Sequence, residues 1–182
     1  MLRGVSVAPS LGKLFGRDSG ISPSDIVQIN VNADGTFSGS SDSPYHGDYP
    51  GASKTFMFPD DSRVADSSGI IYNASDLTYS NSFAGTVDDV TFYGNLPIIL
   101  RGGTLIAFSN TILESGRLTP EDHTPAKIYM NGDTIFSFYH ENSRGVAVTQ
   151  IDVALLTTEV PGEAVDPNGL LYTPDEIILG NE

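Results

Sequence analysis

Apolar and polar residues alternate along much of this chain, which is the pattern of β-strands with one buried side. Within residues 25–38, Val27, Ile29 and Val31 alternate with polar residues. The apolar pattern resumes just after the turn-forming pair Asp34-Gly35. We therefore predict a β-hairpin over this segment.

A second hairpin is predicted where Asn131-Gly132 separates two apolar segments at residues 127–130 and 133–139. Asn-Gly readily adopts the positive φ angles that a two-residue type I′ turn requires. The pair Gly102-Gly103 is likewise expected to reverse the chain. Other short apolar segments, bounded by Gly, Pro, Asn or Asp, are predicted as strands at residues 54–58, 69–72, 89–93, 96–100 and 104–108.

The apolar pattern changes phase farther along the chain. Val146 and Val148 fall on one side of a strand, whereas Ile151 and Val153 fall on the other. Because side chains alternate sides with a period of two, this slip predicts a bulge or a strand break near Thr149-Gln150.

Helical patterns are short. No segment sustains apolar residues at helical spacing for three turns. Helices of one or two turns are expected to begin at residues 119–122 and 173–176, where Thr-Pro precedes two acidic residues. The polar, glycine-rich stretch at residues 39–51 is expected to be a surface loop.

Regularly spaced short strands predict an all-β protein whose body is an antiparallel β-sandwich, similar to a jelly roll. We place this body at residues 25–160. An N-terminal arm at residues 1–24 precedes it. A C-terminal tail at residues 161–182 follows and is expected to dock on the body or on a neighbouring subunit.

Charge is unevenly distributed along the chain. No acidic residue precedes Asp18, whereas Arg3, Lys13 and Arg17 are basic. The remainder holds six of the nine basic residues and all twenty-three acidic ones. An apolar and basic arm on an acidic body predicts docking through the N-terminus. The acidity disfavours nucleic acid as a partner, because the body repels phosphate.

The absence of cysteine excludes disulfides, thiolate metal ligands and thiol nucleophiles. Pro9 and Gly12 interrupt the apolar residues near the N-terminus, so we predict no secretion signal. No stretch is long and apolar enough to span a membrane, and we predict no membrane partner.

Residues 30–36 hold the oxygen ligands and the glycine of the first half of a calcium-binding EF-hand loop. The twelfth position of that loop would be Ser41, which has no carboxylate, so a plain hairpin turn is preferred. The acidic pairs Asp60-Asp61 and Asp88-Asp89 would bind calcium only if loops brought them together. We predict solvated carboxylates and no metal site.

Candidate catalytic groups are sparse. His46, His123 and His140 lack the spacing of a metal-binding motif, and no serine lies in Gly-x-Ser-x-Gly. No glycine-rich phosphate-binding loop is present. We therefore predict no enzymatic activity, no cofactor and no small-molecule substrate.

These features favour a non-enzymatic structural or assembly protein that docks through its termini on other subunits and forms a homo-oligomer. The identity we predict is a virion component, such as a phage capsid decoration, neck or tail protein. The alternative is an extracellular β-sandwich that binds glycans or a cell-surface partner through polar loops, with or without calcium. A hydrolase that uses loop carboxylates ranks last. The predicted interface residues are Leu2, Arg3, Val5, Val7, Leu11, Lys13, Leu14, Phe15, Arg17, Tyr45, Tyr49, Leu170, Leu171, Tyr172, Ile177, Ile178 and Leu179.

Overall fold

The computed structural model describes residues 2–20, 22–141, 145–156, 164–165 and 171–172, and nearly all regular structure in them is β-strand. The strands are β1 (Leu2–Ala8), β2 (Lys13–Asp18), β3 (Ile26–Val31), β4 (Phe37–Asp42), β5 (Thr55–Met57), β6 (Arg63–Asp66), β7 (Ile70–Asn73), β8 (Tyr79–Ser82), β9 (Asp89–Tyr93), β10 (Leu96–Arg101), β11 (Thr104–Phe108), β12 (Glu114–Leu118), β13 (Lys127–Asn131), β14 (Thr134–Glu141), β15 (Gly145–Asp152), β16 (Ala164–Val165) and β17 (Leu171–Tyr172). Two 3-10 helices, η1 (Pro9–Leu11) and η2 (Val153–Leu155), accompany them. No helix in the described ranges is long and apolar enough to cross a membrane.

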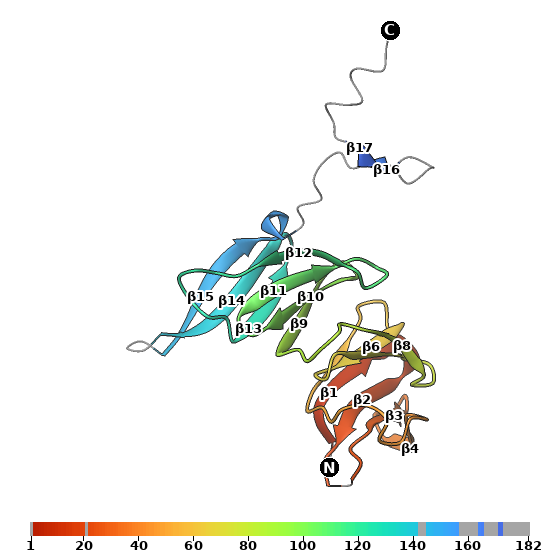
Figure 1. Ribbon diagram of the computed structural model, residues 1–182. Helices are drawn as coiled ribbons and strands as arrows, with labels where there is room; N and C mark the ends of the chain where they lie inside the picture. Colours follow the sequence, from red (N-terminus) through yellow and green to blue (C-terminus); the bar gives the residue numbers. More distant parts are fainter. Residues whose placement is uncertain (1, 21, 142–144, 157–163, 166–170, 173–182) are drawn as a thin grey trace.

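Strands that follow one another in the sequence pair with one another in antiparallel register. They form a first sheet (β1–β4), a second sheet (β5–β8), a third sheet (β9–β12) and a fourth sheet (β13–β15), while β16 and β17 pair separately. The four sheets succeed one another along an arc, with the first and the fourth at opposite ends (Figure 1). First strands approach each other between the first and second sheets, where β1 contacts β5, and between the third and fourth sheets, where β9 contacts β13.

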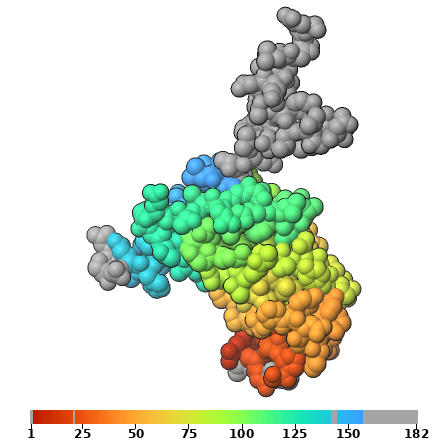
Figure 2. Space-filling model, in the orientation of Figure 1, coloured from red at the N-terminus to blue at the C-terminus, as the bar shows by residue number. Residues whose placement is uncertain are grey.

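Three apolar clusters fill the three junctions between successive sheets. The junctions pair Phe15 and Ile26 with Val64 and Tyr72, Phe58 and Ile71 with Ile99 and Ile106, and Leu100 and Leu105 with Ile135 and Ile151. Burying a side chain of this size stabilises a fold by about 1.5–3 kcal/mol. Face-to-face packing therefore holds the sheets together, and the space-filling view shows them in close succession (Figure 2).

Successive antiparallel sheets that pack face to face, with their first strands adjacent, are the blades of a β-propeller. The predicted all-β fold is confirmed, but the sandwich or jelly roll is wrong, because the sheets are arranged as a four-bladed β-propeller. A jelly roll needs pairing between strands distant in the sequence, whereas here each strand pairs with its sequence neighbour. The ring is open, since no apolar cluster of the described residues joins the first sheet to the fourth.

Most predicted strands are confirmed within a residue or two, and residues 89–93 form β9 as predicted. The predicted reversal at Gly102-Gly103 is also confirmed, with φ angles of +56° and +84°. No helix forms at residues 119–122. The hydroxyl of Thr119, the expected helix cap, is instead hydrogen-bonded to the hydroxyl of Thr104 at 2.8 Å. The second predicted helix, at residues 173–176, lies outside the described residues.

The predicted bulge near Thr149-Gln150 is wrong, because β15 pairs with β14 along its whole length without a register shift. The phase slip has a different cause. Ile151 packs in the junction with the third sheet, whereas Val146 and Val148 lie on the opposite side of β15. Both sides of this sheet therefore carry apolar residues.

The polar stretch at residues 39–51 is only partly a loop, since residues 39–42 belong to β4. The predicted turn between β3 and β4 is confirmed. There, Asp34 Oδ1 accepts hydrogen bonds from the backbone N–H of Thr36 (2.9 Å) and from its hydroxyl (2.6 Å). These bonds lower the pKa of Asp34. The carboxylate thus closes a hairpin turn.

Residues 2–18, which were predicted as part of an arm, form β1, η1 and β2 of the first sheet. Phe15 is fully buried in the junction with the second sheet. Gly4 is required by a close approach of two backbones, because a Cβ there would lie 2.2 Å from the Cα of Lys54. The glycines and cations that suggest an irregular arm therefore belong to a packed blade.

Gly132 occupies the first position of the two-residue turn between β13 and β14, because Asn131 pairs with Thr134. Its φ is +58°, and Asp133 is not among the residues with positive φ. This combination fits a type II′ turn, which has glycine at its first position. The predicted type I′ turn over Asn131-Gly132 is therefore wrong in type and in position.

Gly132→Val is expected to lower the free energy of unfolding by about 1–3 kcal/mol, because a β-branched residue is strained at positive φ. No atom lies within 4 Å of an added Cβ, so strain alone would cause the loss. Urea denaturation measures the effect. Gly51→Ala, which also has open space but no positive φ, is the matched control and should lose nothing. An unchanged midpoint for Gly132→Val would contradict the turn geometry.

Candidate functional site

Each inner sheet of the arc is covered on both sides. In β10, Ile99 packs toward the second sheet, and its neighbour Leu100 packs toward the fourth. Strands covered on both sides are apolar on both sides, which is why alternation is weak in them. The first and the fourth sheets each have one side that no sheet covers in the described part of the chain.

The outer face of the first sheet is the side turned away from the second sheet. Val7, Leu14 and Ile29 lie side by side on it, because they are directly paired across β1, β2 and β3. Val5 and Val27 adjoin them. Val5 and Val7 are 49% and 52% exposed, so this apolar face is open to solvent.

The outer face of the fourth sheet is likewise apolar. Tyr129 is paired with Phe136, and Phe138 is paired with Val148, so these side chains share one side. Val146 lies on the same side, and Tyr129, Val146 and Val148 are 61%, 67% and 53% exposed. A cavity of about 540 Å³ adjoins this face and is lined in part by Tyr129, Phe138 and Val146. Exposed apolar areas of this kind mark interaction surfaces.

The predicted interface residues of β1, η1 and β2 are divided between two environments. Val5, Val7 and Leu11 are exposed, whereas Phe15 and Arg17 are buried against the second sheet. Leu2, Lys13 and Leu14 are half-buried, and Arg3 is exposed. The Lys13 ammonium donates to Gln28 Oε1 at 2.8 Å and to the carbonyl of Ser75 at 2.7 Å.

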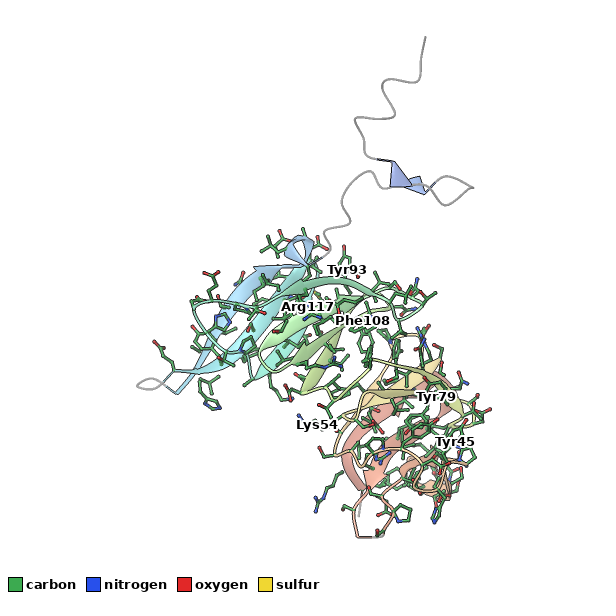
Figure 3. All side chains as sticks on the ribbon, in the orientation of Figure 1. Tyr45, Lys54, Tyr79, Tyr93, Phe108 and Arg117 are labelled. Atoms are coloured by element: carbon green, nitrogen blue, oxygen red, sulfur yellow. The ribbon has the colours of Figure 1, made fainter. Side chains whose placement is uncertain are left out.

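Tyr45 and Tyr49, the predicted contact residues of the polar loop, pack on the junction between the first and second sheets. Their rings meet edge to face with centroids 5.1 Å apart, and Tyr49 stacks on Tyr79 at 5.8 Å. The Tyr45 hydroxyl accepts the backbone N–H of Tyr79 at 2.9 Å, and both side chains lie at this junction in Figure 3.

In the predicted tail, Leu171 and Tyr172 form β17. The other predicted tail residues, which lie outside the described residues, are Leu170, Ile177, Ile178 and Leu179. The interface predictions themselves stay predictions.

His123 links an acid and a serine, an arrangement that sequence spacing does not reveal. Its Nδ1 lies 2.7 Å from Asp122 Oδ1, and its Nε2 lies 3.0 Å from Ser137 Oγ. These are the bonds of a Ser-His-Asp triad. The accessibility of the two end residues is the reverse of that in a catalytic triad, however. The Ser137 side chain is fully buried, while the Asp122 side chain is 80% exposed. A nucleophile must reach its substrate, so this trio is suited to joining β14 to the preceding loop.

Three potential metal ligands meet at one end of the first sheet. Asp25, Asp42 and His46 have ligand atoms within 4.8 Å of one another. Asp25 already accepts the backbone N–H of Gly47 at 3.2 Å, and His46 Nδ1 lies 3.2 Å from Asp25 Oδ2. The acidic pair Asp60-Asp61 takes no part, since Asp60 accepts the backbone N–H of Ser62 and Asp61 accepts that of Ser10 in η1.

A buried ion pair crosses the junction between the first and second sheets. Arg17 Nη1 donates to Asp66 Oδ2 at 2.9 Å, and the two side chains are 2% and 0% exposed. Burial raises the pKa of Asp66, against the lowering effects of the Ser68 hydrogen bonds and the Arg17 charge. With a raised folded-state pKa, the stability that comes from binding a proton at Asp66 is fully present below its unfolded pKa. This proton-linked part is lost as pH rises through the folded value, while the ionised carboxylate remains the partner of Arg17.

A further cavity of about 750 Å³ lies where loops of all four sheets meet, with a lining that includes Ser24, Lys54, Asp88 and Ala126. Lys54 Nζ donates to the backbone carbonyl of Asp88 at 2.9 Å. The Asp88 carboxylate accepts the backbone N–H of Gly102 at 2.8 Å. Both charged groups of this cavity therefore serve the blade connections.

Comparison of the sequence with known proteins finds no match, either to a protein-family model or to a curated protein. Solved structures do share the fold. A chain of a mitotic checkpoint complex is 14% identical, with a TM-score of 0.60 over 84% of this chain and 48% of that chain.

Two computationally designed proteins are also similar. Ika4 is 11% identical, with a TM-score of 0.59 over 84% of this chain and 91% of Ika4. Ika8 is 11% identical, with a TM-score of 0.57 over 82% of this chain and 46% of Ika8. The chain thus spans about half the length of Ika8 and of the checkpoint chain.

These similarities concern β-propeller proteins, and identities this low show the fold alone. The predicted jelly roll is corrected to a propeller, and nothing in these similarities indicates the predicted virion, capsid or decoration protein.

Proposed function

We propose that this chain is a non-enzymatic assembly module that binds protein through the outer faces of its first and fourth sheets. The observation that carries the proposal is the exposure of Val5, Val7, Val146 and Val148. Inside the arc, apolar residues of the corresponding strands pack in the junctions, where they are buried or half-buried. Apolar area left in water at both ends favours a partner that covers it.

Two further features support a binding module over an enzyme. Ser137 and His123 are bonded like catalytic groups, yet the serine is buried. The charged residues Lys54 and Asp88 of the 750 Å³ cavity are bonded to backbone groups. The glycan-binding alternative has less support, because Tyr45 and Tyr49 pack on each other and on the junction.

Site-specific photo-cross-linking tests this proposal. A benzophenone amino acid is placed at Val5, at Val148, or at Leu113, which is 69% exposed but lies on neither outer face. Proteins with the probe at Val5 or Val148 are expected to form defined protein adducts, and the Leu113 control is expected to form none. Mass spectrometry identifies the partner.

A true docking contact adds a second expectation. Introducing Val146→Asp on the same face should abolish the Val148 adduct, since burying an unpaired carboxylate is costly. Equal adduct yields from Val148 and Leu113, or no adducts from either face, would refute protein binding through these faces.

A further inference from the structure

We propose that the partner is a second copy of this chain, so that two arcs of four sheets close head to tail into one ring of eight. The fourth sheet of each copy packs its outer face on the outer face of the first sheet of the other. This inference rests on the proposed function, and names the occupant of the faces described there.

The three existing junctions are the first argument, because the two outer faces are the two halves of one more junction. In the third sheet, Leu100 and Leu105 face the following sheet, and in the fourth sheet Ile135 and Ile151 face the preceding one. The outer face of the fourth sheet is the side that would pack on a following sheet, and no sheet follows it. The outer face of the first sheet is the side that would pack on a preceding sheet, and no sheet precedes it.

The contact between first strands extends this argument to single residues. Thr91, the third residue of β9, accepts the backbone N–H of Met130, the penultimate residue of β13, at 2.9 Å. Tyr129 is the third residue of β13, and Val7 is the penultimate residue of β1. Tyr129 of one copy therefore stands where it would meet Val7 of the other.

Charge is complementary between the same two faces. Lys127 begins β13, and its ammonium is 3.4 Å from Asp89 with a side chain that is 64% exposed. The exposed residue His140 lies at this same end of the fourth sheet. In the first sheet, the corresponding end carries Asp42, which is exposed and paired with Val27 of the outer face. Asp42 is on β4, at the far edge of the sheet from β1, so it attracts these groups over a distance without pairing with Lys127.

The number of copies follows from chain length and symmetry. This chain covers 91% of Ika4 but only 46% of Ika8, so four sheets correspond to about half of the longer propeller. A contact between two different faces forms a ring if the rotation closes and a filament if it does not. Two arcs of four sheets close with a twofold axis, and both pairs of outer faces become buried.

Molar mass in solution is the first test. Light scattering on the purified full chain is expected to give twice the chain mass of 19.4 kDa. Val148→Asp should weaken the dimer at least about a hundredfold, because each of the two new junctions would bury a carboxylate. Val148 is exposed in the single chain, so folding should be unaffected. Leu113→Asp is the matched control and should stay dimeric.

Engineered cysteines test which faces meet, and the natural chain has no cysteine to interfere. Tyr129→Cys mixed with Val7→Cys is expected to form an interchain disulfide under mild oxidation, whereas each variant alone is not. Leu113→Cys mixed with Tyr129→Cys is the control and should not cross-link. The double variant Val7→Cys/Tyr129→Cys should form a dimer with two disulfides.

Several results would overturn the ring. They are a monomeric mass at all concentrations, a disulfide formed by Val7→Cys alone, a disulfide within one chain of the double variant, or open-ended filaments. A monomer whose Val5 and Val148 probes cross-link to a different protein would refute the second copy while leaving the proposed protein binding intact. No adducts at all would refute both.

Discussion

Asp66→Ala is expected to lower the free energy of unfolding by about 3–5 kcal/mol, the usual effect of removing one partner from a buried ion pair. Arg17 would then keep its charge in a site where it is 2% exposed. Arg17 also donates to the carbonyls of Ser24 and Pro50, which are neutral acceptors. Urea denaturation at neutral pH measures the loss.

A double variant separates the charge effect from the loss of packing. Arg17→Met/Asp66→Leu removes both charges and is expected to lose much less than Asp66→Ala, because an apolar pair no longer requires desolvated ions. The raised pKa of Asp66 indicates that burial outweighs the stabilising bonds of the carboxylate. If the double variant were the less stable protein, the ion pair would be a net source of stability.

Strand periodicity predicts the elements of this fold better than their arrangement. Residues 89–93 and 104–108 are strands because short apolar runs are bounded by turn residues, and both are found. The turn at Gly102-Gly103 also follows from local backbone chemistry. A propeller and a sandwich share these local signals, and what differs is which sheet covers which. The packing of one sheet on another depends on contacts between residues distant in the sequence, and periodicity carries no information about those contacts.

The outer face of the fourth sheet leaves a signal in the sequence, but the same signal also fits a bulge. The phase slip between Val148 and Ile151 is read as a bulge if a sheet is assumed to have one apolar side. In the structure, the slip arises because the fourth sheet is apolar on both sides, and one of these sides is uncovered. The His123 trio had no such signal, because Asp122, His123 and Ser137 meet only through the pairing of β13 with β14.

Cations and glycines interrupt the apolar pattern of the N-terminal residues, and this interruption predicts an arm. Gly4 and Arg17 each have a structural role within the blades. Gly4 allows β1 to approach Lys54, and Arg17 neutralises a carboxylate that belongs to the second sheet. The Arg17 cation, which the sequence offers for docking, is thus paired inside the chain. Complementary partners 49 residues apart are not recognisable from charge patterning alone.

Deletion of residues 1–17 is expected to abolish cooperative unfolding. The deletion removes β1 and most of β2, exposes Val64 and Tyr72, and leaves Asp66 without its partner. Losing the buried Phe15 side chain alone costs about 3–5 kcal/mol, while a whole domain has a stability of only about 5–15 kcal/mol. Near-ultraviolet circular dichroism and urea denaturation report the loss. Val5→Ser/Val7→Ser is the matched control, and since both side chains are about half exposed, the single chain should remain folded. A truncated protein that unfolds at the natural midpoint would show that these residues are an arm outside the folding core.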